Sequence, residues 1–148
     1  MRMVLAVTLL LAIAQVKPGD TGKDQERLQG LWQAVSMEAN GEAAPAEQVN
    51  KFQLHFKGDK VVFLPKLDNR EHAYHLDPKT EPKGMDITPG DGDKKGEKLP
   101  CAIYNLAGDK LIVCIDKELS HGKRPTEFKT GPGDGLVLIT LERVRQAK

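Results

Sequence analysis

The chain has 148 residues, which allows one domain with a real hydrophobic core and leaves little room for two. Its 22 basic and 21 acidic residues give a formal net charge of +1, so it lacks the electrostatic footprint of a protein that binds nucleic acid or an anionic membrane. Its 14 glycines and 9 prolines favour short strands joined by tight turns over a helical bundle.

Residues 1–14 have the layout of a secretory signal peptide. Arg2 provides a basic start, an apolar run follows from Val4 to Ala14, and this run ends in the small-x-small pattern that precedes cleavage. The run is too short to span a bilayer, so we expect cleavage after Ala14 and no integral membrane span afterwards, with an uncleaved anchor as the alternative. The protein is therefore expected to be exported, to a periplasm or to the medium.

The next segments connect the leader to a first strand and a short helix. Residues 15–27 are assigned as a linker and residues 28–145 as the folded domain, although the polar stretch 21–29 is compatible with one or two helical turns. A strand is predicted over residues 30–38, before an Asn-Gly turn. Residues 45–51 then begin with a proline and predict a short helix that crosses to the next strand.

The rest of the chain reads as short strands. Residues 52–57 alternate strictly, which places Phe52, Leu54 and Phe56 on one face, and a Gly-Asp turn leads into a strand over 60–64. Further strands are predicted over residues 71–76, 84–88, 102–106, 111–115, 126–130 and 136–143. Because the connections are too short for parallel crossovers, the pattern predicts an all-β fold, an antiparallel up-and-down barrel of about eight strands with one short helix near the N-terminus.

Two cysteines lie on the arms of one predicted hairpin. If Leu106 faces Leu111 across it, then Ile103 faces Cys114, and Cys101 is the diagonal neighbour of Cys114 on the same face. Diagonal neighbours are about 7–8 Å apart at Cα, near the outer limit for a bridge. A disulfide between Cys101 and Cys114, which an exporting compartment permits, and a pair of buried free thiols both stay open, and the free thiols are favoured.

The patterns that carry catalysis or metal binding are not found. Neither Ser36 nor Ser120 lies in a nucleophile-elbow motif, and His72 and His75 point to opposite faces of a strand. The acidic stretch 86–93 lacks the ligand order of an EF-hand and is interpreted as a solvent-exposed turn. We therefore predict no catalytic residue, no metal ligand and no cofactor, and hence a protein that is not an enzyme.

A charged pair surrounds a proline late in the chain, at Arg124-Pro125-Thr126-Glu127-Phe128. Proline is poorly tolerated in a central strand, so this segment is expected to begin an edge strand or to lie on the rim of the barrel. On the rim, Arg124 could meet an anionic ligand. The plainer alternative is a surface ion pair with Phe128 in the core.

A longer set of motifs covers nearly all of the chain after the leader. They are Leu28-Gln29-Gly30-Leu31-Trp32, Phe56-Lys57-Gly58-Asp59, Tyr74-His75-Leu76-Asp77-Pro78, Met85-Asp86-Ile87-Thr88-Pro89, Ile103-Tyr104-Asn105-Leu106 to Gly108-Asp109, Cys114, Arg124 to Phe128, and Leu141-Glu142-Arg143. In this order they resemble an uncharacterised lipocalin-like domain family abundant in planctomycete bacteria. The resemblance implies that Arg143 stacks on Trp32 at the closed end of a barrel. It implies no activity.

The fold and the resemblance lead to two functional hypotheses. The first is an exported, non-enzymatic domain whose barrel binds a small apolar or amphipathic ligand, a hypothesis based on architectural analogy. The alternative is a structural or protein-interaction module with a filled barrel and a rim around Arg124 and Phe128; no nucleic acid is expected, and no protein partner is specified. The side chains that would line a ligand site or fill a core are Trp32, Phe52, Leu54, Phe56, Tyr104 and Val113.

Overall fold

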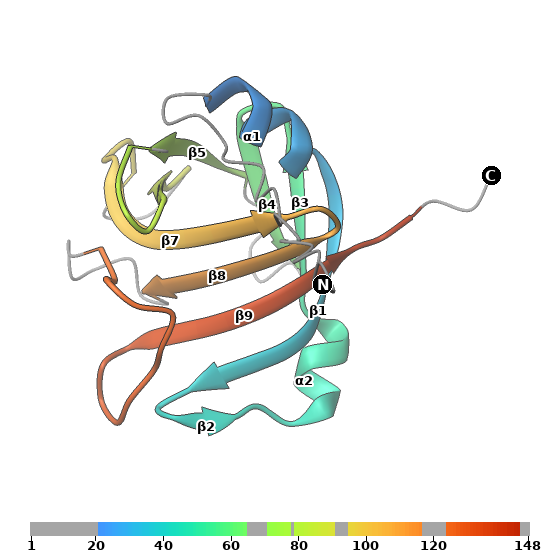
Figure 1. Cartoon of the computed structure of the whole chain (residues 1–148), viewed down its shortest axis with the longest axis vertical. Helices are drawn as coiled ribbons and strands as arrows, with labels where there is room; N and C mark the ends of the chain where they lie inside the picture. Colours follow the sequence, from blue (N-terminus) through green and yellow to red (C-terminus); the bar gives the residue numbers. More distant parts are fainter. Residues whose placement is uncertain (1–20, 65–70, 78, 91–94, 117–123, 146–148) are drawn as a thin grey trace, which may run out of the picture.

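The computed structural model describes residues 21–64, 71–77, 79–90, 95–116 and 124–145, so the predicted signal peptide lies outside the described residues. In these ranges the chain forms one antiparallel sheet rolled into a closed barrel, with two short helices (Figure 1). The helices are α1 (Thr21–Leu28) and α2 (Ala46–Lys51). The strands are β1 (Gly30–Ala39), β2 (Glu42–Ala43), β3 (Gln53–Lys57), β4 (Lys60–Leu64), β5 (Glu71–Asp77), β6 (Gly84–Thr88), β7 (Leu99–Ala107), β8 (Lys110–Asp116) and β9 (Leu136–Arg143).

The sheet has an up-and-down topology. From β3 to β9 each strand pairs with the next one in sequence, β1 pairs with β3, and β9 returns to pair with β1. The strand β2 is a two-residue arm that pairs only with the end of β1. The barrel wall therefore consists of eight strands, and the predicted all-β antiparallel lipocalin-like architecture is confirmed.

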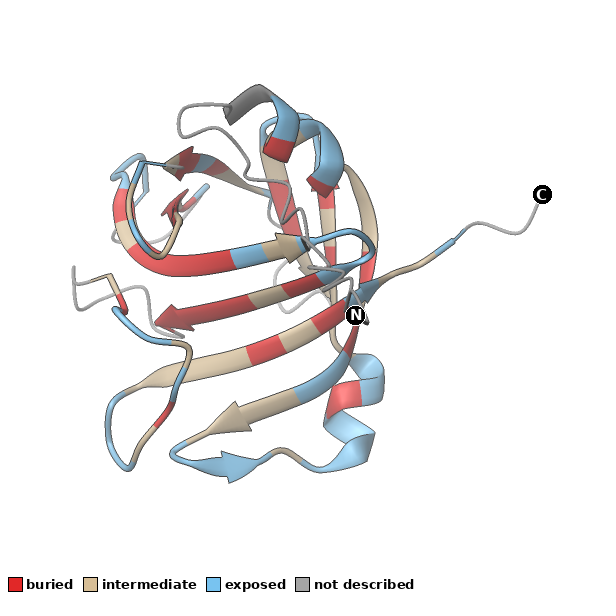
Figure 2. Ribbon diagram, in the orientation of Figure 1, coloured by how far each residue is buried: buried red, intermediate tan, exposed pale blue. Residues whose placement is uncertain are grey.

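Alternation along the strands places one set of side chains inside the barrel. Leu54 and Phe56 of β3, Leu111 and Val113 of β8, and Leu141 of β9 are all buried in one hydrophobic core. On β7 and β8 both faces are buried over part of the strand, which Figure 2 shows as a continuous buried stretch on each. The hairpin of β7 and β8 has the predicted register, since Leu106 pairs with Leu111 and Ile103 with Cys114.

The two helices cover different parts of the barrel. The first, α1, lies at the end where β1 begins and β9 ends, which we call the closed end (Figure 1). At the opposite end α2 packs beside β1 and buries Val49, so the helix predicted over residues 45–51 is confirmed. The segment 21–27, assigned as linker from the sequence, belongs to the folded domain instead, because α1 buries Asp24 and Leu28.

One predicted strand is wrong. Residues 126–130 form bends and irregular backbone. The reason is that β8 and β9 already pair along their whole length and β9 also pairs with β1, so the wall offers no free edge there. The buried Pro125 would also interrupt a ladder at the start of such a strand.

Candidate functional site

The closed end is organised around Trp32 and Arg143. Trp32 has no exposed surface, and its indole Nε1 donates to the carbonyl oxygen of Leu28 at 2.8 Å. The Arg143 guanidinium carbon lies 4.5 Å from the centroid of the indole ring, as the resemblance implied. This confirms the predicted stack, which is worth roughly 0.5–2 kcal/mol in comparable sites.

Arg143 also ties α1 to the end of β9. Its Nη1 donates to the carbonyl oxygen of Gln29 at 2.8 Å, and its Nη2 donates to that of Arg27. Its Nε donates to Asp109 at 3.1 Å. With its ring contact and these bonds, the guanidinium acts as a structural clasp of the closed end, so it is not free to bind a ligand.

A buried carboxylate anchors α1 inside the barrel. Asp24 is 1% exposed. Its Oδ2 accepts a hydrogen bond from the Tyr104 hydroxyl at 2.7 Å and forms an ion pair with the Lys83 ammonium at 3.0 Å. Burial, together with Asp24 itself, raises the pKa of Tyr104 far above its usual value of 10.0. Sequence reasoning missed Asp24 because it lies in a polar stretch whose two partners are 59 and 80 residues away.

The side chain of Gln29 makes a further set of hydrogen bonds at the closed end. Its Oε1 accepts from the backbone N–H of Gly58 at 2.6 Å, and its Nε2 donates to the carbonyl oxygen of Gly58 at 2.9 Å and to the Tyr74 hydroxyl at 3.1 Å. Gly58 has a φ of +59°, in the left-handed region that glycine adopts most easily. The turn between β3 and β4 is thereby joined to the end of α1.

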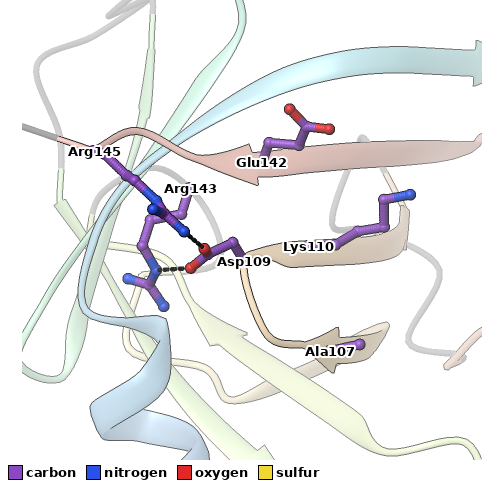
Figure 3. Close-up of a pocket in the computed structure, with 6 residues that line it drawn as sticks. All are labelled: Ala107, Asp109, Lys110, Glu142, Arg143 and Arg145. Carbon is purple, nitrogen blue, oxygen red and sulfur yellow. Dashed lines mark hydrogen bonds and ion pairs between the residues drawn. The ribbon is translucent and has the colours of Figure 1, made fainter.

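A surface hollow of about 450 Å³ opens beside the closed end (Figure 3). The side chains that line it are mostly charged: Ala107, Asp109, Lys110, Glu142, Arg143 and Arg145. Asp109 accepts from both arginines, and Figure 3 shows the two guanidinium groups reaching it from the end of β9. The bond from Arg145 is the main reason that the pKa of this carboxyl lies below its usual range. The hollow therefore has both signs of charge on its walls.

The interior is filled by the residues that sequence analysis placed there. Trp32, Leu54, Phe56, Tyr104 and Val113 are buried in the core, each no more than 3% exposed. Phe52 is half-buried and packs against the core from the end of α2. If a cavity of ligand size lay between these side chains, part of their surface would be accessible to a water molecule inside it. Their near-zero exposure argues against such a cavity.

At the end opposite α1, four inward-facing side chains are only half-buried. We call them the mouth: Met37, Phe63, His72 and Val137. Met37 pairs with Ile139 and His72 with Val61, both core residues, so the register directs them inward. The rings of Phe63 and His72 meet edge to face at 5.5 Å, and His72 Nδ1 accepts from the N–H of Gly90 at 3.3 Å.

Arg124 does not stand on a rim open to ligands. Its Nη2 donates to Asp86 at 2.7 Å and its Nη1 to the carbonyl oxygen of Ala102 at 3.3 Å, on the outer surface of β6 and β7. Asp86 was interpreted as part of an exposed turn, but it is a buried strand residue. The predicted ion pair of Arg124 forms with Asp86 and not within its own segment, and Phe128 is half-buried outside the core cluster.

Both cysteines are free and buried, which is the favoured alternative of the sequence analysis. Cys114 lies on the outer surface of β8, because its neighbour Val113 faces inward. Cys101 belongs instead to the hydrophobic core cluster, beside an irregularity in the pairing of β6 with β7. Burial raises the pKa of Cys101 to about 12 and that of Cys114 above its ordinary value. Such thiols are poor nucleophiles at neutral pH.

Within the described ranges, no three His, Cys, Asp or Glu side chains gather as a metal site. No helix in those ranges is long and apolar enough to cross a bilayer. Comparison of the chain with protein-family models, with curated proteins and with solved structures finds no match. The fold therefore defines the class, a closed eight-stranded antiparallel barrel, and the function has to be argued from its surfaces.

Proposed function

We propose that this protein is an exported, non-enzymatic interaction module whose barrel is filled by its own side chains. The observation that carries the proposal is the interior: Trp32, Leu111 and Leu141 have 0% exposure, and Tyr104 has 1%. Small-molecule sites in proteins are clefts or cavities of roughly 300–1,000 Å³. Side chains that line such a space have surface to offer a ligand, and these do not.

The charged hollow beside the closed end is the contact surface that we assign to this function. It is bordered by the turn between β7 and β8 and by the end of β9, both held rigidly by Arg143. Lys110 and Glu142 are exposed, as is Arg145. Walls of both signs suit a protein segment that presents complementary charges better than they suit an apolar molecule.

The mouth favours a second candidate, a binding site for the apolar part of an amphipathic ligand. Met37, Phe63 and Val137 face inward there and keep part of their surface exposed. The ring of His72 is the polar group beside them. A ligand at this place would rest on the core without entering it.

Titration with N-phenyl-1-naphthylamine, a small apolar fluorophore, distinguishes the two candidates. For a filled barrel we expect no saturable rise in fluorescence. A saturable rise that is lost in Met37→Glu would favour the mouth and contradict a barrel without a ligand. Val35→Glu is the matched control, because Val35 lies on the same strand and is 47% exposed.

Export is tested separately. N-terminal sequencing of protein recovered from the periplasm or medium of an expressing cell should begin at Gln15. Recovery of an uncleaved chain in the membrane fraction would contradict export by a cleaved signal.

A further inference from the structure

We propose that residues 124–130 act as a strap that is fastened by Arg124 at one end and by Thr130 at the other. Closed, the strap covers part of the outer surface of the sheet and shields Cys114; unfastened, it exposes this thiol. This conformational device is independent of the proposed interaction function, because the charged hollow lies at the other end of the barrel.

The first fastening is the Arg124 guanidinium. It bonds Asp86, which is 7% exposed, at 2.7 Å, and it also bonds the backbone of β7 at Ala102. It lies directly over Gly84, where any β-carbon would collide with it. Glycine at this position of β6 thus leaves room for the arginine, and the buried carboxylate gives it a charged partner. Removing one member of such a pair costs much more than removing one member of an exposed pair, because the buried carboxylate is left without a counter-charge.

The second fastening is Thr130, which is 5% exposed. Its hydroxyl donates to Glu38 at 2.8 Å and accepts from the N–H of Gly41 at 3.0 Å, so it grips the hairpin of β1 and β2. The strap therefore begins on β6 and β7 and ends on β1. Figure 1 shows this segment, in orange, passing the ends of β8 and β9 toward that hairpin.

The thiol of Cys114 lies beneath the path between the two fastenings. Cys114 directs its Sγ to the carbonyl oxygen of Lys129 in the strap, at 3.8 Å. The Cys114 side chain is on the outer side of the sheet, because Val113 beside it faces inward, yet it is 0% exposed. On an uncovered outer surface it would meet water.

The test uses 5,5′-dithiobis(2-nitrobenzoate). A protein thiolate attacks the disulfide of the reagent, forms a mixed disulfide and releases thionitrobenzoate, while the thiol proton passes to the buffer. Arg124→Gln removes the charge of the first fastening. We expect Cys114 of this variant to react at least about tenfold faster than Cys114 of the native protein, since the local opening costs less.

Arg145→Gln is the matched control, because Arg145 is also an arginine paired with an aspartate, Asp109, but on the charged hollow. The cysteines of the Arg145→Gln variant should react at the native rate. Thr130→Val, which keeps the shape of the side chain, should accelerate Cys114 in the same way and serves if Arg124→Gln does not fold. Mass spectrometry of the labelled peptides assigns each rate to its cysteine.

Low concentrations of urea separate opening of the strap from global unfolding. Reaction through the strap should hardly depend on urea, whereas reaction through the unfolded state rises steeply with it. The proposal is overturned if the strap variants react at the native rate. It is also overturned if their labelling follows global unfolding at every urea concentration, or if the native thiols already react as fast as in denatured protein.

Discussion

Trp32 is the only tryptophan of the chain, so its fluorescence reports directly on the closed end. Arg143→Gln would remove the cation over its ring and the bonds to the carbonyl oxygens of α1. We expect a red-shifted emission and a loss of about 2–3 kcal/mol in the free energy of unfolding. Urea unfolding followed by that emission measures both. Arg145→Gln should leave both unchanged, and equal losses in the two variants would contradict the clasp.

Asp24 is the second residue whose role is specific enough to test. In Asp24→Asn the Tyr104 hydroxyl keeps an acceptor, but Lys83, whose side chain is 27% exposed, loses its charged partner. We expect the variant to lose about 1–3 kcal/mol of unfolding free energy, because charge-assisted hydrogen bonds to a buried carboxylate are lost. Glu26→Gln, an exposed position on the same helix, is the control for chemical denaturation. Similar losses in both variants would show that Asp24 is no anchor.

These residues also show how far sequence reasoning reaches at this scale. The stack of Trp32 and Arg143 could be predicted because a motif marks both positions. Asp24 and Asp86 could not, since a carboxylate is buried only when its charge is compensated, and here the side chains that hydrogen-bond to the two carboxylates lie 38 to 80 residues away. Polarity alone assigns such residues to the surface.

At the scale of elements, α1 is the test of where the domain begins. A chain starting at Thr21 should unfold in one cooperative transition, with a blue-shifted emission from the buried Trp32. A chain starting at Leu28 lacks Asp24 and most of α1, which uncovers the closed end. We expect it to be less stable by at least about 3 kcal/mol, through lost burial and the unpaired Lys83 and Tyr104. Equal stabilities would restore the linker interpretation.

The strands were easier to predict than their surroundings. Alternation of Leu54 and Phe56 fixes the inward face of β3, and the short turn at Gly108 fixes the register of β7 on β8. The strand predicted over residues 126–130 does not form, because a strand needs a free edge as well as a suitable sequence. Closure of the barrel by β9 on β1 removes that edge, and closure is a property of the whole sheet.

At the scale of the whole molecule, buried thiol and phenol groups make the free energy of unfolding depend on pH in the alkaline range. Burial raises the pKa values of Cys101, Cys114, Tyr74 and Tyr104. Below pH 9, the ordinary thiol value, the folded and unfolded chains both hold the thiol proton of Cys101, and its contribution is complete. Between pH 9 and about 12 the unfolded chain releases that proton while the folded chain keeps it, so stability falls.

Each such proton gives a slope of about 1.4 kcal/mol per pH unit. We therefore expect the urea midpoint to fall progressively above pH 9, and to fall less steeply in Cys101→Ala, whatever the starting stability of that variant. The slope, and not the midpoint at neutral pH, is the informative quantity, because the alanine also removes packing. An unchanged slope would mean that Cys101 ionises in the folded protein and that water reaches its thiol. A smaller slope in the alanine variant would show that the core around Cys101 stays dry up to the pH at which the unfolded chain ionises.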